Sequence, residues 1–299
     1  MKQGIFSIGD DMIMRFKPED LEECLMSLPI DNWMFVDTDK HYYSEESSKW
    51  LRPKMLISHL SELKGIQVND QVVINAFTDF TDILNSKILS PTFRIILEKA
   101  RNMSVKRYQT LGCHLMNHKN DPILFPYLVA VDAKIILKSY FKERVIEFRV
   151  YTFNEHKSMN HYNELFYKLC FRNIDFDTFK SDIVIFEKND YHMKFSYFIG
   201  MTYNKGNITS FRYALMLPTK RVMRCDAFES LFLGHSLEFN DQLKTTMRKI
   251  FYDEIKMLRL TINHKIYSEE IFEELIWKVV YNLLERSRND EKGQNQTTN

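Results

Sequence analysis

Four side chains in the C-terminal half of the sequence could together bind and transfer a phosphoryl group. His192 begins a predicted strand beside a polar turn, and Lys194 follows it two positions later. Lys188 lies in the turn, and Arg149 lies on an earlier predicted strand. Lysine and arginine hold phosphate oxygens, and a histidine kept neutral between cations can act as a nucleophile. The pattern suggests a phosphate cleft with His192 as the catalytic candidate, although a histidine at a strand end is more often a surface residue.

The common motifs for phosphate binding and hydrolysis do not occur in the sequence. Neither G-x-x-x-x-G-K-[ST] nor G-x-G-x-x-G is found, and the chain has only eight glycines. The motifs G-x-S-x-G and H-E-x-x-H are also missing. Any phosphate chemistry would therefore depend on side chains rather than on a backbone cradle.

His114 and His118 are four residues apart on a predicted helix, beside Cys113. This spacing could place two metal ligands on one helix face. Because no third ligand is evident nearby, we interpret the pair as two histidines on the polar face of the helix and predict no metal site.

A second group of basic residues, in the N-terminal half, could form a groove for single-stranded nucleic acid. Tyr42, Tyr43, Trp50 and Tyr108 lie near it in the sequence and could stack on bases. The candidate RNA-binding residues are Lys49, Arg52, Lys54, Arg94, Arg101 and Arg107, with Lys99 and Lys106 beside them. Solvated helix faces are an equally good explanation of this group. With 41 basic and 40 acidic residues, a protein that wraps DNA is not expected.

The composition is that of a globular protein, with 44% hydrophobic and 27% charged residues in 299. The four cysteines form no C-x-x-C pair and each has apolar neighbours, so we expect reduced, buried thiols. No run of 18 apolar residues occurs. A soluble cytoplasmic protein without membrane contact is the resulting expectation.

Apolar periodicity predicts an α+β fold. Residues 55–140 show helical spacing, whereas residues 145–151 alternate with period two and predict a strand. Further strands are predicted at 183–186, 193–203 and 208–217, with a hairpin turn at 204–207, and helices at 159–172, 236–260 and 268–286. We therefore expect a mainly helical domain at 1–140, an α+β domain at 141–286 and a disordered tail at 287–299.

The order of these segments resembles that of the rotavirus nonstructural protein two family, over roughly residues 90–258. The segments that carry the resemblance are 117–125, 146–155, 163–165, 183–197, 204–207 and 243–256. The strand at 146–155 has Arg149 where the family has a lysine. The segment 183–197 is similar to the family's strand, turn and histidine-bearing strand.

The resemblance implies a histidine-triad-like C-terminal subdomain with an antiparallel sheet and amphipathic helices. His192 would be the catalytic histidine, Arg149 and Lys194 would hold phosphate with help from Lys188, and Arg52 and Lys54 would belong to the basic rim. Lys188 stands where the family has a second histidine, which puts hydrolysis in doubt.

The implied function is that of a viral single-stranded-RNA-binding protein with Mg²⁺-dependent NTPase and RNA 5′-triphosphatase activity. It would act as a homo-octamer in host cytoplasmic replication bodies (viroplasm), as an RNA chaperone alongside a viral polymerase and a viral phosphoprotein. The alternative is a non-enzymatic RNA-binding scaffold of the same fold with a degenerate cleft.

Overall fold

The computed structural model describes residues 15–30, 33–36, 54–103, 109–117, 121–153, 163–188, 191–204, 207–218, 221–224, 226–234, 241–257 and 272–283. The chain divides into two compact units. Unit 1 comprises Met1–Asp121 and Asp132–Asn173, and unit 2 comprises Pro122–Val131 and Ile174–Asn299. A short segment in the first half of the chain therefore belongs to the same unit as the C-terminal half.

Unit 1 begins with a small parallel sheet in the order β1 (Arg15–Phe16), β3 (Lys54–Leu56), β2 (Met34–Val36). Helix α1 (Leu21–Ser27) starts at Asp20, whose carboxylate accepts a hydrogen bond of 2.8 Å from the backbone N–H of Glu23. Such a cap satisfies one of the free N–H groups at a helix start. A 3₁₀ turn at Leu28–Ile30 follows.

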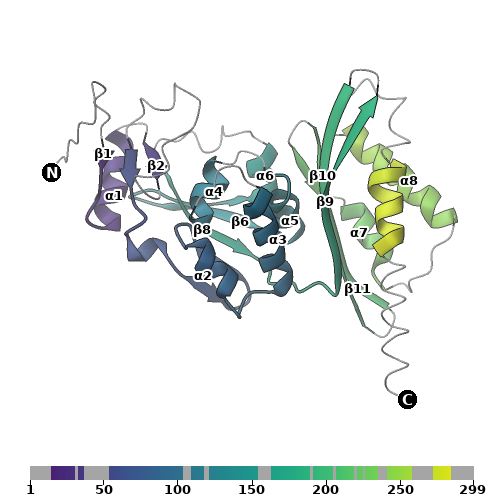
Figure 1. Ribbon diagram of the computed structural model, residues 1–299, viewed down its shortest axis with the longest axis horizontal. Coiled ribbons are helices and arrows are strands. Elements are labelled where there is room, and N and C mark those ends of the chain that lie inside the picture. The colour runs from purple at the N-terminus through teal and green to yellow at the C-terminus, as the bar shows by residue number, and fades with distance from the viewer. Residues whose placement is uncertain are drawn as a thin grey trace, which may run out of the picture. The chain divides into compact units, whose positions relative to one another are not determined.

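A five-stranded antiparallel sheet forms the centre of unit 1. Its order is β4 (Ile66–Val68), β5 (Val72–Asn75), β8 (Leu165–Phe171), β6 (Lys134–Lys138), β7 (Glu143–Glu147). Residues 135 and 137 of β6 are buried whereas residues 134, 136 and 138 are not, so one face of the sheet forms the core. Besides α1, unit 1 contains the helices α2 (Phe80–Asn85), α3 (Pro91–Met103), α4 (Leu111–Asn117) and α6 (Phe148–Phe153), and a 3₁₀ turn spans Ser61–Leu63 (Figure 1). Phe93 of α3 packs on Phe171 of β8 at 4.7 Å between ring centroids.

Unit 2 is built on a four-stranded antiparallel sheet in the order β12 (Val222–Arg224), β11 (Asn207–Met216), β10 (Tyr191–Asn204), β9 (Thr178–Lys188). Both faces of β10 are buried. Its residues 195, 197, 199 and 201 join a core with Phe228 and Phe232 of α7 (Asp226–Phe232) and Met247 of α8 (Asp241–Met257). On the opposite face, Phe198 lies edge-on to Tyr127 of α5 (Leu124–Ala130), with 5.0 Å between ring centroids. The sheet of unit 2 is therefore covered on both sides.

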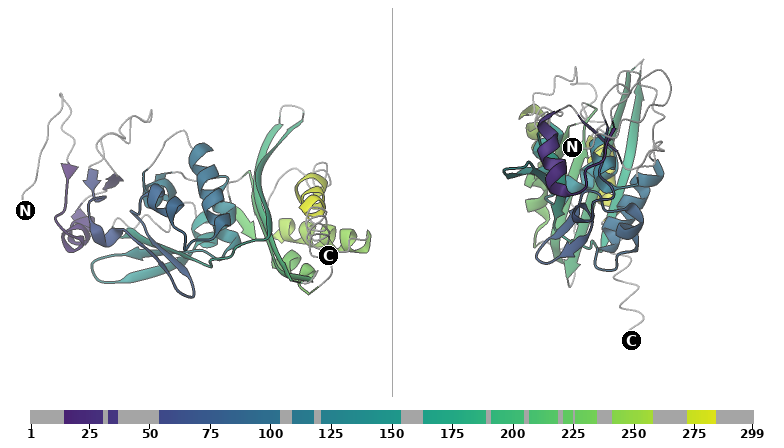
Figure 2. Two further views of the ribbon diagram at one scale, coloured as in Figure 1. Left: turned by 60° about the horizontal axis from the view of Figure 1, so that its bottom comes forward. Right: turned by 90° about the vertical axis from the view of Figure 1, so that its left-hand side faces the viewer.

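Two views show α7 and α8 on the same side of this sheet (Figures 1 and 2). A π-helical segment, Phe272–Trp277, continues as α-helix through residues 278–283 and adds Ile276, Val279, Val280 and Leu283 to the same core. Gly200 faces the other way, where a Cβ atom would lie 2.6 Å from the ring of Phe176. The glycine therefore lets the aromatic ring lie directly against the strand.

The α+β class, with antiparallel sheets and several helices, is confirmed. The strands at 183–186, 193–203 and 208–217 are confirmed as parts of β9, β10 and β11, and the helices at 236–260 and 268–286 are confirmed over their described cores. The hairpin turn itself and the tail at 287–299 lie outside the described residues.

Several helix predictions are wrong. Residues 159–172 contain strand β8, residues 55–65 contain the end of β3 and a 3₁₀ turn, residues 72–75 form β5, and residues 134–138 form β6. In each case several of the apolar residues are buried, but a short apolar run does not distinguish a strand from a helix. The predicted strand at 145–151 ends early, because residues from Phe148 onward form α6. The predicted domain ranges 1–140 and 141–286 stay a prediction.

Cys24, Cys113 and Cys170 are buried free thiols, as expected, and Cys225 lies outside the described residues. Burial raises the pKa of the Cys24 thiol to about 12, with a smaller contribution from the charge of Glu23. Its Sγ lies 3.6 Å from the sulfur of Met55. Among the described residues, no helix is long and apolar enough to cross a membrane.

Candidate functional site

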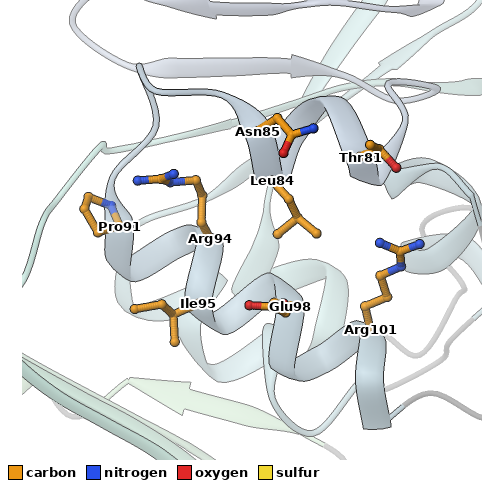
Figure 3. Close-up of a pocket in the computed structure, with 8 residues that line it drawn as sticks. All are labelled: Thr81, Leu84, Asn85, Pro91, Arg94, Ile95, Glu98 and Arg101. Carbon is orange, nitrogen blue, oxygen red and sulfur yellow. The ribbon is translucent and has the colours of Figure 1, made fainter.

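An open groove of about 500 Å³ lies between helices α2 and α3 of unit 1 (Figure 3). It combines two arginines and one glutamate with apolar and neutral polar side chains. Its lining residues are Thr81, Leu84 and Asn85 of α2 and Pro91, Arg94, Ile95, Glu98 and Arg101 of α3. Its volume lies within the range of ligand sites, but its lining is more polar and charged than theirs usually is.

The charged residues of helix α3 line the groove because the opposite face of the helix is buried in the core. Phe93, Ile96, Leu97 and Ala100 are buried, whereas Ile95 and Glu98 are exposed. The helix starts at Pro91, and the hydroxyl of Ser90 accepts a hydrogen bond of 3.2 Å from the N–H of Phe93. Since 94 and 101 are seven residues apart, their Cα atoms are separated by about two turns, or about 10 Å along the axis.

The two arginines occupy opposite ends of the groove, and Glu98 lies between them (Figure 3). The Nε atom of Arg94 is buried and has no hydrogen-bond partner among the described residues. The guanidinium carbon of Arg101 lies 5.9 Å from the centroid of the Phe80 ring, a cation–π arrangement that orients it. The groove therefore presents positioned donors to any molecule that enters it.

A buried, hydrogen-bonded pair of side chains, His114 and Asp121, lies next to the same phenylalanine. The Nε2 atom of His114 in α4 is 2.8 Å from Oδ2 of Asp121, and their side chains are 1% and 5% exposed. The imidazole ring meets Phe80 edge-on at 5.4 Å. Our interpretation of His114 as a polar-face residue is therefore wrong, because its partner, seven residues further along the chain, was not recognised. His118 lies outside the described residues.

The start of α4 is closed to ligands by its own hydrogen bonds. The N–H of Gly112 donates to the carbonyl of Ala76, and the N–H of Leu111 donates to that of Thr78. The N–H of Cys113 reaches the hydroxyl of Thr110 at 3.5 Å. These backbone donors pair within the protein, so this helix start does not offer them to an anion.

Gly112→Ala is expected to destabilise unit 1 by about 2 kcal/mol, the usual cost of overpacking. The added Cβ would lie 2.6 Å from the carbonyl oxygen of Ala76 and 2.9 Å from its Cβ. Because the carbonyl of Ala76 accepts a hydrogen bond from Gly112 and its Cβ is fixed to the same backbone, neither atom can move away freely. Urea denaturation of both proteins measures the difference. A loss of stability smaller than a few tenths of a kcal/mol would show that the close contact is not needed.

In unit 2, Glu229 of α7 lies between two arginines of the sheet. Its carboxylate accepts hydrogen bonds from Arg212 at 2.8 Å and from Arg224 at 2.5 Å, and one from the backbone N–H of Tyr213 at 3.2 Å. Burial raises the pKa of Glu229 to about 7, although the contacts with Arg224 and Tyr213 act in the opposite direction. The cluster ties α7 to strands β11 and β12 and has a titratable group at its centre.

The four residues predicted to form a phosphate cleft belong to both units of the chain. Arg149 belongs to unit 1, where it lies on α6 and pairs with Glu147 at 2.9 Å. His192 and Lys194 lie on β10 and Lys188 ends β9, all in unit 2, with His192 opposite Glu187 in the register. Lys194 is exposed. Their assembly into one site stays a prediction.

The predicted RNA-binding residues fall into three groups. Arg94 and Arg101 come together in the groove, whereas Lys54 lies in β3 with 2% of its surface exposed. Lys49, Arg52 and Arg107 lie outside the described residues. Sequence reasoning missed Glu98 and Glu229. The spacing of Glu98 from Arg94 and Arg101, four and three residues along a helix, was the available signal for the first.

No family model and no curated protein matches this chain. Several solved structures are similar to it. A carbon monoxide dehydrogenase chain from Hydrogenophaga pseudoflava, from an enzyme that lacks the Mo-pyranopterin moiety of its molybdenum cofactor, is similar with a TM-score of 0.60 and 16% identity, over 81% of this chain and 86% of that one. A chain of quinoline 2-oxidoreductase from Pseudomonas putida 86 has a TM-score of 0.62 and 15% identity, over 84% and 86%. A chain of the reconstituted CO dehydrogenase from Oligotropha carboxidovorans is similar with a TM-score of 0.61 and 12% identity, over 81% of this chain and 86% of that one.

These neighbours define a fold shared with chains of oxidoreductases, and they overturn the resemblance to the rotavirus family. The expectations built on it are therefore wrong: the viral NTPase and triphosphatase activity, its Mg²⁺, the RNA-binding scaffold, the octamer, and the RNA, polymerase and phosphoprotein partners. The resemblance rested on the order of short segments. One of these, at 163–165, was matched to a helix but leads into strand β8.

Proposed function

We propose that this chain is a subunit of an oxidoreductase. The observation that carries the proposal is the extent of the fold similarity, which covers more than four fifths of this chain and of each oxidoreductase chain compared with it. Fold alone does not determine chemistry, so the proposal concerns the class of reaction and leaves the substrate open.

We propose further that the described part of the chain does not itself hold a redox metal, and that it contributes to the oxidoreductase by binding an organic molecule or another subunit. One similar structure, a cyanide-inactivated form of a CO dehydrogenase, is named for copper and molybdenum, and another is named as lacking the Mo-pyranopterin moiety of its molybdenum cofactor. Among the described residues of this chain, no group of three His, Cys, Asp or Glu side chains could hold a metal ion. The donor set here therefore does not fit a metal centre, and we derive no metal step from it. The finer arrangement predicted from the sequence, a helical subdomain followed by a histidine-triad-like one, has no support from these neighbours.

The composition of the native assembly tests this proposal. The tagged chain would be isolated under mild conditions from the organism that encodes it, and also produced alone in a heterologous host. Metal content by mass spectrometry and extracted organic chromophores, flavins included, would be measured for both. We expect a redox metal or redox chromophore in constant ratio to the chain in the native assembly, and no bound redox metal in the chain produced alone.

An assembly that contains no redox metal and no redox chromophore would contradict the proposal. A stoichiometric redox metal in the chain produced alone would contradict its second part. Gly112→Ala is the control for association through the folded chain. It is expected to destabilise unit 1 without changing any charged or metal-binding side chain, so less metal or chromophore should be isolated with it.

A further inference from the structure

We propose that the groove between α2 and α3 is a binding site for an elongated organic dianion, a molecule with an anionic group at each end and a less polar middle. The inference is independent of the proposed redox role, because it rests on the side chains of the groove alone. No described feature of the fold requires two arginines on this surface.

The arginines supply the two anchoring positions. A guanidinium group binds a carboxylate or phosphate through two parallel N–H donors. Within the described part of the chain, Arg94 and Arg101 form no ion pair, and the buried Nε of Arg94 lacks a hydrogen-bond partner. Because this Nε is covered by the protein, an anion in the groove would be held by the terminal Nη groups of Arg94.

The separation of the arginines sets the length of the ligand. The two side chains start about 10 Å apart along the helix axis and lie at opposite ends of the groove (Figure 3). A small anion can reach only one of them. A molecule with two anionic groups separated by a chain of several carbons can reach both.

The middle of the groove sets the chemistry of the ligand between its ends. Leu84 offers apolar contact between the arginines, and Ile95, which is 51% exposed, offers it at the Arg94 end (Figure 3). Glu98 lies between the two arginines and would repel a third negative charge placed there. It would accept a hydrogen bond from a hydroxyl or amine instead. A linear dicarboxylate, or the equivalent molecule with terminal phosphates, fits this pattern better than a trianion or a nucleoside triphosphate.

Calorimetric titration with a homologous series of dicarboxylates, from succinate to dodecanedioate, tests the proposal on the full chain. We expect affinity to rise with chain length, to reach a maximum where both arginines are engaged, and to fall beyond it. A monocarboxylate with the same number of carbons is expected to bind at least about tenfold more weakly, since it loses one charge-assisted contact. A bisphosphate of the best length distinguishes a general dianion site from one selective for carboxylates.

Arg94→Gln and Arg101→Gln should each reduce the affinity for the best dicarboxylate to that of the monocarboxylate. Lys142→Gln is the matched control, because it removes the same charge from an exposed position of unit 1 outside the groove. Glu98→Gln should instead increase binding. No binding of any dicarboxylate, affinity independent of chain length, or equal losses in the Arg and Lys142 variants would overturn the proposal.

Discussion

His114→Ala is expected to destabilise unit 1 by about 1 to 3 kcal/mol, the usual cost of leaving a buried polar group without its hydrogen-bond partner. Asp121 would keep its carboxylate in a site where its side chain is 5% exposed, without the imidazole nitrogen that now lies 2.8 Å away. The substitution would also remove the ring that packs on Phe80. Denaturation monitored by circular dichroism, at neutral pH, measures the loss.

A double-mutant cycle separates the contribution of the His114–Asp121 hydrogen bond from that of packing. His114→Leu combined with Asp121→Leu removes both polar groups while keeping apolar volume, and such replacements are often neutral or stabilising. We therefore expect the double variant to be clearly more stable than either single variant. The loss of stability in the double variant is compared with the sum of the losses in His114→Leu and Asp121→Leu. If it equals that sum, His114 and Asp121 are not coupled and this account of the pair is wrong.

The stability of unit 2 is expected to fall as pH rises from about 4.5 to about 7, relative to a Glu229→Gln variant. The folded-state pKa of Glu229, about 7, lies above its ordinary value of 4.5. A carboxyl whose pKa is raised by folding contributes its full stability below the ordinary pKa and loses it as pH rises through the folded one. At about 1.36 kcal/mol for each pKa unit, the total change is about 3 kcal/mol.

The matched amide variant, Glu229→Gln, supplies the control. Its side chain cannot titrate but keeps the size of the original and an oxygen that accepts from Arg212 and Arg224. Urea denaturation of both proteins at intervals between about pH 4 and about pH 8 gives the difference. A difference that stays constant over this range, or that grows in favour of the wild type as pH rises, would show that the arginines outweigh burial and keep the carboxylate ionised.

The sequence predicts secondary structure well where a pattern is long and poorly where an apolar run is short. The long hairpin of β9, β10 and β11 was predictable, because alternating apolar residues and an Asn-Lys-Gly-Asn turn agree over more than thirty residues. Strand β8 was not, since its seven residues, Leu165–Phe171, hold apolar side chains at positions that fit either a strand or a helix. Its pairing with β5 and β6, which are distant in the chain, decides between the two.

The candidate sites depend on such distant contacts even more strongly. Arg94 and Arg101 were identified as basic residues, but the groove exists only because α2 packs beside α3. Glu229 meets Arg212 from a strand 17 residues earlier, and no local pattern marks that contact. The resemblance to a phosphohydrolase family failed for the same reason: short matching segments carry no information on how the chain pairs them.

The oxidoreductase role is tested most directly by reductive titration of the native assembly in the absence of oxygen. Dithionite would be added in small steps while the visible absorption spectrum is recorded, and air or an electron-accepting dye would then be admitted. The account predicts a visible spectrum that bleaches in proportion to the electrons added and recovers on oxidation. A spectrum without visible absorption, or one that dithionite does not change, would contradict it.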